Sequence, residues 1–206
     1  MGSSSGEASA SDPSAAASAR AEDAAAKRVA RTVLVLMGVS GSGKTTIAQE
    51  LHRLLGWQFK EGDDLHPPAN VEKMRAGHPL NDDDRKPWLA AVALWIDERL
   101  AAGEPGIITC SNLKRAYRRI TVNDRKGVTL VYLKGDEALI AERIAARKHR
   151  YMPASLLRSQ FETLEEPGAD ERALVVPLES TVAETALDLL RNLAAAQAKE
   201  AAALNG

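Results

Sequence analysis

Residues 38–45 of the chain read GVSGSGKT and satisfy the pattern G-x-x-x-x-G-K-[ST] in full. An apolar run, TVLVLM, precedes this segment, and residues 45–55, which have helical periodicity, follow it. A strand, a glycine-rich loop and a helix in this order let backbone N–H groups surround a phosphate at a helix N-terminus. The segment therefore predicts an α/β domain that binds a nucleoside triphosphate. The alternative is an ordinary glycine-rich turn with Lys44 in solvent.

The remainder of the chain alternates between short apolar runs and amphipathic stretches. GIITC, VTLVYL and ALVVPL share the β-branched character of TVLVLM and are typical of strands buried on both faces. Residues 57–60 can supply a fifth strand. Helical periodicity covers residues 45–55, 88–102, 137–147 and 181–193. This alternation predicts a parallel sheet with helices on both of its faces.

Composition narrows the class of protein. The chain has 206 residues, a formal net charge of −1 and one cysteine, Cys110, which we interpret as a small buried hydrophobe. The charge does not indicate a nucleic-acid partner or an anionic membrane, and no apolar run approaches the roughly 20 residues of a membrane span. We expect a disordered Ser/Ala-rich tail at residues 1–31, one domain at residues 32–198 and a frayed end at residues 199–206.

The glycine-rich loop supplies the candidate nucleotide contacts. Lys44 can reach the β- and γ-phosphates, and the Thr45 hydroxyl can ligate Mg²⁺. The loop therefore predicts a bound nucleoside triphosphate with Mg²⁺. The loop residues expected to bind nucleotide are Gly38, Val39, Ser40, Gly41, Ser42, Gly43, Lys44, Thr45 and Thr46.

Residues 62–89, GDDLHPPANVEKMRAGHPLNDDDRKPWL, are unusually rich in carboxylates, histidines and prolines. Asp63 follows the second strand and should face the ligand crevice of an open α/β sheet, where a carboxylate can orient or deprotonate an attacking hydroxyl. His66, Asn70 and Lys73 share one helical face that suits a hydroxyl-rich ligand. Residues 81–84 can cap the next helix, and we assign Asp82 and Asp83 to that cap or to a solvated face.

A basic segment follows the third strand. Lys114 and Arg118 lie four residues apart, which predicts two cations on one helical face where a carboxylate could dock. The alternative is a solvated basic face.

Four segments carry a family resemblance: MGVSGSGKT, residues 62–89, CSNLKRAYR and SQFETLEEPGADE. Through them the chain closely resembles the gluconokinase family, small P-loop kinases that phosphorylate D-gluconate at its 6-hydroxyl. The resemblance covers roughly residues 32–195. It implies a nucleotide- and shikimate-kinase-like P-loop fold, with five parallel strands in the order 2-3-1-4-5, flanking helices and a short lid.

The resemblance also implies residue roles. The implied cofactors are ATP and Mg²⁺. Asp63 matches the carboxylate expected at the acceptor hydroxyl and in the Mg²⁺ shell. Glu61 stands where the family usually has an aspartate that acts on Mg²⁺ through water. Arg85 and Trp88 match the family's DRxPWL element, which contributes to the gluconate pocket or its scaffold. Asn112 replaces the usual alanine.

In this fold superfamily the segment containing Arg143 and Arg147 is a lid whose cations neutralise charge during transfer and exclude water. Residues 149–151, HRY, replace the usual Gly-His-Phe. The alternative is that these are surface arginines of a helix. Arg143 and Arg147 join the loop residues in the expected nucleotide-binding set, and Arg147 is the stronger candidate.

The expected catalytic residues are Lys44, Asp63 and Arg147, and the expected metal ligands are Thr45 and Asp63. The expected substrate-binding residues are Asp63, His66, Lys73, Arg85, Ser111, Lys114 and Arg118. The resemblance further implies a cytoplasmic homodimer that feeds the pentose phosphate route. Two alternatives remain: a related kinase of shikimate or a nucleoside monophosphate, and a non-catalytic nucleotide-binding switch.

Overall fold

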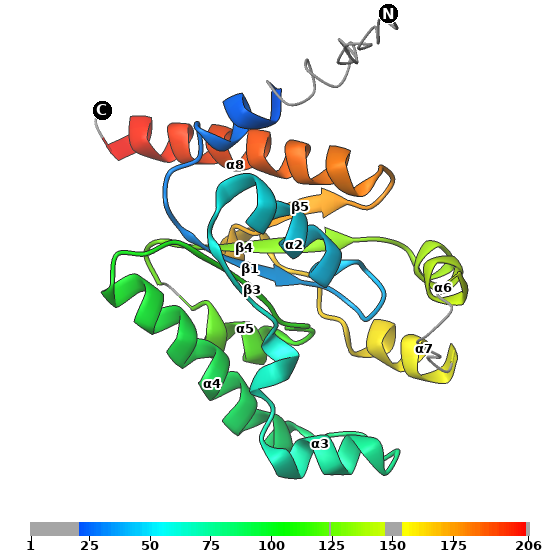
Figure 1. Cartoon of the computed structure of the whole chain (residues 1–206). Helices are drawn as coiled ribbons and strands as arrows, with labels where there is room; N and C mark the ends of the chain where they lie inside the picture. Colours follow the sequence, from blue (N-terminus) through cyan, green and yellow to red (C-terminus); the bar gives the residue numbers. More distant parts are fainter. Residues whose placement is uncertain (1–20, 124, 147–153, 205–206) are drawn as a thin grey trace, which may run out of the picture.

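A computed structural model describes residues 21–123, 125–146 and 154–204. Its centre is a parallel sheet of five strands in the order β2-β3-β1-β4-β5 (Figure 1), which confirms the expected topology. The strands are β1 Val33–Met37, β2 Gln58–Lys60, β3 Gly106–Thr109, β4 Val128–Lys134 and β5 Leu174–Pro177.

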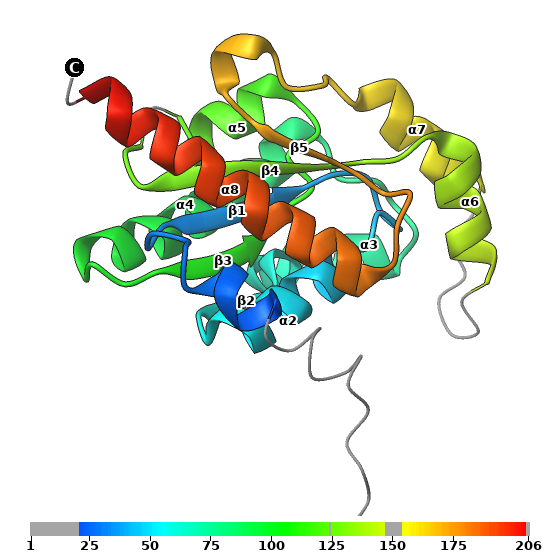
Figure 2. The same ribbon diagram turned by 90° about the horizontal axis from the view of Figure 1, so that it is seen from above.

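Helices cover both faces of the sheet. The helices of the described residues are α2 Lys44–Leu55, α3 Pro68–Arg75, α4 Asp82–Ala101, α5 Arg115–Thr121, α6 Glu137–Ala145, α7 Ala154–Thr163 and α8 Val182–Leu204, with short 3-10 turns η1 Gly62–Leu65 and η2 Ala169–Glu171. Helices α2 and α8 lie on one face and α4 and α5 on the other (Figure 1), and Figure 2 shows α8 running across the strands.

Strand β1 shows why the apolar runs lack alternation. Leu34 and Leu36 belong to the hydrophobic core under α2 and α8, whereas Val33, Val35 and Met37 belong to the core under α4. All five side chains are fully buried because successive side chains of a strand point to opposite faces. A strand buried on both sides needs apolar residues at every position.

The start of α4 confirms the predicted cap and moves the helix boundary. Asn81 Oδ1 accepts a hydrogen bond of 2.8 Å from Asp84 N, and Asp84 Oδ2 accepts one of 2.8 Å from Asn81 N. This reciprocal capping box satisfies backbone donors at the helix start. It begins α4 at Asp82, six residues before the start that the apolar periodicity suggested, because those first residues are held by capping and not by burial.

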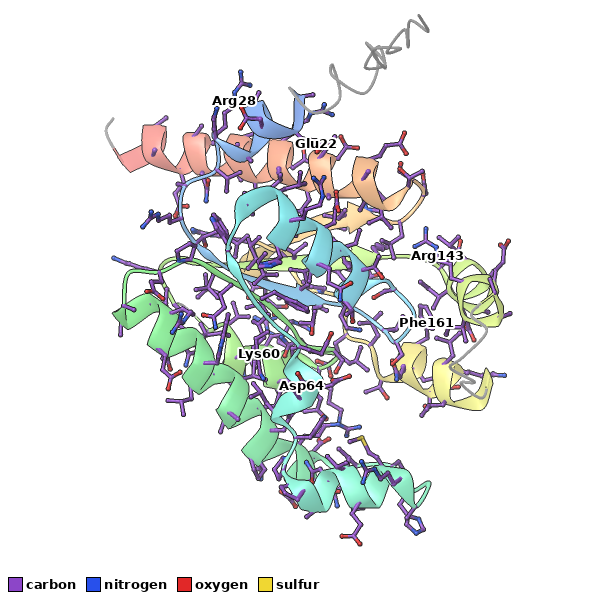
Figure 3. All side chains as sticks on the ribbon, viewed as in Figure 1. Glu22, Arg28, Lys60, Asp64, Arg143 and Phe161 are labelled. Atoms are coloured by element: carbon purple, nitrogen blue, oxygen red, sulfur yellow. The ribbon has the colours of Figure 1, made fainter. Side chains whose placement is uncertain are left out.

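Residues 21–30 pack onto the domain, although composition assigned them to the tail. Residues 21–26 are helical, and Ala25 is buried in the core beneath α8. Gln197 of α8 accepts a 2.8 Å hydrogen bond from Ala30 N and donates one of 3.1 Å to Ala30 O. Glu22, labelled in Figure 3, forms an ion pair of 2.9 Å with Arg53. Residues 21–30 of the predicted tail, where the sequence allowed a weak helix, thus contact the domain, and residues 1–20 lie outside the described residues. Small alanines permit this close packing.

Helix α8 continues through residue 204, beyond the predicted domain end at residue 198. Within the described ranges, none of the helices combines the length and apolar character required to cross a bilayer.

Candidate active site

The glycine-rich loop connects β1 to α2 at the carboxyl edge of the sheet. Gly38 has φ of 144°, and a Cβ there would lie 2.9 Å from both Leu133 O and Ser42 Oγ. Gly41 has φ of 86°, and a Cβ there would lie 2.7 Å from the Ile144 side chain. These positions need glycine both for their left-handed backbone and for the close approach of neighbouring chain.

The start of α2 is open to an anion. Gly43 is its N-cap with φ of 84°, no side chain caps the helix, and its first turn holds no acidic residue. The first N–H groups of α2 are therefore left for a ligand, as phosphate binding requires. Thr45 and Thr46 are exposed there, whereas Val39 and Ser42 are buried and can offer only backbone groups.

Lys44 lies along the rim of the loop. Its Nζ donates hydrogen bonds of 2.9 Å to Gly38 O and 3.0 Å to Val39 O. Ser111, at the end of β3, approaches the same rim because its carbonyl accepts a 3.3 Å hydrogen bond from Gly38 N. The structure thus brings two predicted site elements, the loop and the segment after β3, into direct contact.

A cavity of about 370 Å³ adjoins the loop. Gly41, Ser42 and Thr46 line one side, Arg143 of α6 another, and residues 178–185 after β5 the third. Arg143 Nη2 donates a 2.6 Å hydrogen bond to Leu178 O, and Figure 3 shows Arg143 and Phe161 at the same end of the molecule. Arg143 therefore lies beside the loop as predicted. Arg147 and residues 149–151 lie outside the described residues.

Glu61 joins three elements of the site. Its carboxylate accepts a 2.7 Å hydrogen bond from Thr45 Oγ1 and a short one from Thr109 Oγ1 at the end of β3. Thr109 Oγ1 in turn accepts a 3.1 Å hydrogen bond from Gly62 N. Thr45 and Asp63 are the expected metal ligands, and Glu61 matches a position that acts on Mg²⁺ through water; in the structure it is Glu61 that contacts the Thr45 hydroxyl.

Asp63 lies in the 3-10 turn after β2 and is exposed, and its side chain has no hydrogen bond or ion pair to other described residues. The turn itself is fixed. Trp88 Nε1 donates a buried 2.7 Å hydrogen bond to Gly62 O, so Trp88 is both core and scaffold.

Burial raises the pKa of the nearby Cys110 thiol to about 12, and the Asp63 charge adds to that rise. Cys110 is a protonated, buried side chain, as expected.

His66, Asn70 and Lys73 all contact the start of α4, although only Asn70 and Lys73 lie on α3 and His66 precedes that helix. The His66 ring stacks on Trp88 at 4.3 Å between centroids, and burial is the main cause that lowers the His66 pKa. Asn70 Nδ2 donates a 2.7 Å hydrogen bond to Asp84 O, and Lys73 Nζ donates one of 2.6 Å to Asp84 Oδ2. These contacts orient α3 relative to α4.

Lys114 and Arg85 meet around a carboxylate. Lys114 Nζ lies 2.8 and 2.9 Å from the two oxygens of Asp82, Tyr117 OH donates a 2.5 Å hydrogen bond to the same group, and Arg85 Nη1 lies 3.9 Å away. Hydrogen bonds from Lys114 and Tyr117 lower the Asp82 pKa. Asp82 thus bridges α4 to α5, whereas the cap of α4 is made by Asn81 and Asp84.

Arg118 does not share a ligand-facing surface with Lys114. It is 2% exposed, and Glu171 accepts two of its hydrogen bonds, at 2.6 and 2.9 Å. The carbonyls of Asn112 and Glu165 accept others, at 3.1 and 2.8 Å. The prediction of Arg118 as a substrate-binding residue is corrected: Lys114 is the N-cap of α5, so the assumed helical spacing fails, and Arg118 points into the protein.

Asn112 is fully buried, with φ of 48°. Its Oδ1 accepts a 3.1 Å hydrogen bond from Thr121 Oγ1. This departure from the family's alanine therefore acts on the turn between β3 and α5, and not on a ligand hydroxyl.

Gln160 of α7 is a site residue that the sequence left unassigned. Its side-chain amide binds Ser40 of the glycine-rich loop at two points, although 120 residues separate them. No local pattern indicates this contact. For Glu61, by contrast, its place at the end of β2 was an available signal.

Comparisons with known proteins agree with this geometry. A family model described as an AAA domain matches residues 33–167. A gluconokinase of Gluconobacter oxydans is 51% identical over 143 residues, covering 69% of this chain and 80% of that protein. The chain belongs to the gluconokinase family. The thermoresistant gluconokinase of Escherichia coli is 46% identical over 158 residues, covering 74% of this chain and 90% of that protein.

A crystal structure of a gluconokinase from Sinorhizobium meliloti superimposes with a TM-score of 0.72 and 43% identity, covering 83% of this chain and 99% of that one. The residues that the family model matches, 33–167, run from β1 through the glycine-rich loop and the segments after β2 and β3 to the end of α7. Members of this family are kinases, so the chain has the architecture of an ATP-dependent carbohydrate kinase.

Proposed function

We propose that this protein is a gluconokinase that transfers the γ-phosphoryl group of ATP to the 6-hydroxyl of D-gluconate, giving 6-phospho-D-gluconate and ADP. The observation that carries the proposal is the junction at Glu61. It ties Thr45, the first helical turn of the nucleotide loop, to Thr109 and hence to the turn that presents Asp63. Donor and acceptor elements therefore meet at one point of the sheet edge.

The donor side fits Mg·ATP. The uncapped N-terminus of α2 and the glycines at 38 and 41 form a cradle that Cβ atoms would fill. Lys44 would balance charge on the β- and γ-phosphates, and Thr45 with Glu61 beside it would hold the metal directly or through water. When bound, Mg²⁺ neutralises charge and aligns the phosphates. The cavity beside Arg143 and Thr46 suits the adenosine moiety.

The acceptor side is built by the turn after β2 and the segment after β3. Asp63 is exposed and its side chain is unpaired within the described residues, so it can accept the proton of a hydroxyl or hold that hydroxyl in line. Lys114 and Arg85 provide cations for the carboxylate of a sugar acid. A neutral sugar lacks the negative charge that would pair with these cations.

Further features of the proposal rest on the family resemblance. They are Mg²⁺ as the metal, a homodimer, a cytoplasmic location and a role in supplying the pentose phosphate route. The protein partner in this proposal is a second copy of the chain, and the substrate is small.

A coupled assay of ADP release with Mg·ATP tests the function against its alternatives. D-gluconate, shikimate, AMP and no acceptor are compared, with Asp63→Asn alongside. Stimulation by gluconate alone supports the proposal, and loss of that stimulation in Asp63→Asn supports the role of this carboxylate. Stimulation by shikimate or AMP instead would favour a related kinase, and tight ATP binding without any stimulated turnover would favour a switch.

A further inference from the structure

Gln160 of α7 binds the glycine-rich loop by a two-point contact. Ser40 N donates a 2.7 Å hydrogen bond to Gln160 Oε1, and Gln160 Nε2 lies 3.1 Å from Ser40 Oγ. Gln160 is half-buried. The contact joins a loop that receives phosphate to a helix far away in the sequence.

The chemistry of the two groups fixes how the amide is oriented. A backbone N–H can donate only to an oxygen, so Oε1 of Gln160 must face Ser40 N and Nε2 must face Ser40 Oγ. The amide nitrogen carries two N–H groups, and Ser40 Oγ uses one. The second has no acceptor among the described residues, so a ligand oxygen can accept from it.

Lys44 shows which part of a triphosphate this amide would meet. Its Nζ rests on the carbonyls of Gly38 and Val39, the residues directly before Ser40. A lysine of this motif reaches the β- and γ-phosphates. The rim formed by residues 38–40 is therefore the γ-phosphate end of the loop, and the Gln160 amide lies on that rim.

Helix α7 gives Gln160 a firm base. Leu157 on the same helix is buried in the core. Just after the helix, Glu165 N donates a 2.8 Å hydrogen bond to Leu113 O, and Glu165 Oε2 accepts one of 2.6 Å from Arg115 N. Glu165 therefore anchors α7 to the backbone on both sides of Lys114, which belongs to the acceptor side.

We propose that Gln160 is a further phosphate-binding residue, which donates its second amide N–H to the γ-phosphoryl group while its carbonyl holds the Ser40 rim of the loop. The proposal rests on the proposed use of ATP but not on the identity of the acceptor. It predicts that Gln160 distinguishes ATP from ADP, because only ATP has a phosphate at that end of the loop.

Two substitutions separate phosphate binding from loop support. Gln160→Glu keeps both contacts to Ser40, since a carboxylate can accept from the backbone N–H and from the hydroxyl, but it removes the donor and adds negative charge. Gln160→Ala removes both contacts to Ser40 and the second amide N–H. Ser159→Ala is the matched control, because Ser159 is exposed on the same helix and, among the described residues, its hydroxyl hydrogen-bonds only to Leu156 O.

Calorimetric titration would measure binding of Mg·ADP and of the magnesium complex of the β,γ-imido ATP analogue, with thermal unfolding as a check on folding. A lost hydrogen bond to a charged group corresponds to roughly tenfold or more in affinity. We expect Gln160→Glu to lose about that much for the ATP analogue, with ADP affinity within about twofold of wild type. Gln160→Ala should lose at least as much for the analogue and less for ADP, because it also removes the support of the loop, and Ser159→Ala should be unchanged.

Equal losses for both nucleotides would overturn the proposal and leave Gln160 as a loop support. Wild-type affinity of Gln160→Glu for the ATP analogue would overturn it as well. Gluconate turnover by the wild-type protein is assayed separately, so a failure of the proposed acceptor is distinguishable from a failure of this inference.

Discussion

Gly62 offers the most direct test of how the acceptor side is positioned. A Cβ at this residue would lie 1.9 Å from Thr109 O, a backbone atom, whereas real Cβ atoms essentially never approach closer than 3.0 Å. In Gly62→Ala the turn after β2 must therefore move away from β3 by about 1.1 Å. That shift strains the Trp88 hydrogen bond to Gly62 O and displaces the adjacent Asp63.

A misplacement of about 1 Å can lower a rate by roughly 100-fold when reacting groups must be held in line. We expect Gly62→Ala to lower kcat/KM for gluconate by about that factor, and overpacking to reduce the free energy of unfolding by about 1–3 kcal/mol. The coupled assay measures the first quantity, and urea unfolding followed by circular dichroism measures the second.

Gly103→Ala is the control. Gly103 has φ of 65° and nothing within 4 Å of the added Cβ, so this change strains the backbone at the end of α4 without a clash. We expect a stability loss of about 1 kcal/mol and unchanged turnover. If folded Gly62→Ala retained kcat/KM within about threefold of wild type, the position of this turn would not control how the acceptor is aligned.

Three further predictions follow from contacts elsewhere in the site. Glu61→Gln removes the charge beside the Thr45 hydroxyl, so the Mg²⁺ concentration for half-maximal activity should rise roughly tenfold in a magnesium titration; an unchanged titration would refute a role for Glu61 near the metal. Arg118→Met removes the ion pair of the half-buried Glu171 carboxylate, which keeps its hydrogen bond from Gly168 N, and should lower the free energy of unfolding in urea by about 3 kcal/mol, the low end for breaking a buried pair. KM for gluconate should stay within about threefold; a large rise in KM would restore Arg118 as a substrate residue. Burial holds the His66 pKa below its ordinary 6.5, so the unfolded chain binds this proton first and stability falls as pH drops below about 6.5. His66→Phe should keep the ring stacking and reduce that slope when urea unfolding is compared between pH 7 and pH 5; an unaltered slope would contradict it.

The fold was predictable because its signals are local. The loop at residues 38–45 fixes a strand before it and a helix after it. Strand β1 is apolar at every position, and its neighbours β3 and β4 are mostly apolar, because both faces of the sheet are covered. The boundaries were less predictable. The first turn of α4 is held by Asn81 and Asp84 through hydrogen bonds, and hydrophobic periodicity carries no information about such a turn.

The site was predictable only where the sheet edge dictates it. Residues that follow β1, β2 and β3 meet because parallel strands end at one edge, which placed Lys44, Asp63 and Ser111 near one another in advance. Arg118 and Gln160 show the limit. The partner that buries Arg118 is 53 residues away, and the partner of Gln160 is 120 residues away, so no spacing rule could assign either side chain.

The acidity of residues 62–89 has a structural explanation that also shapes recognition. Asp84 fastens α3 to α4 through Lys73, and Asp82 fastens α4 to α5 through Lys114 and Tyr117. Each carboxylate holds a cation at the acceptor side in a fixed place before any substrate arrives. A sugar-acid carboxylate that binds Lys114 must therefore share it with Asp82 or replace Asp82 there. Such a site favours an acceptor whose charged group and hydroxyls can take the hydrogen bonds from Lys114 and Tyr117 that Asp82 accepts in its absence.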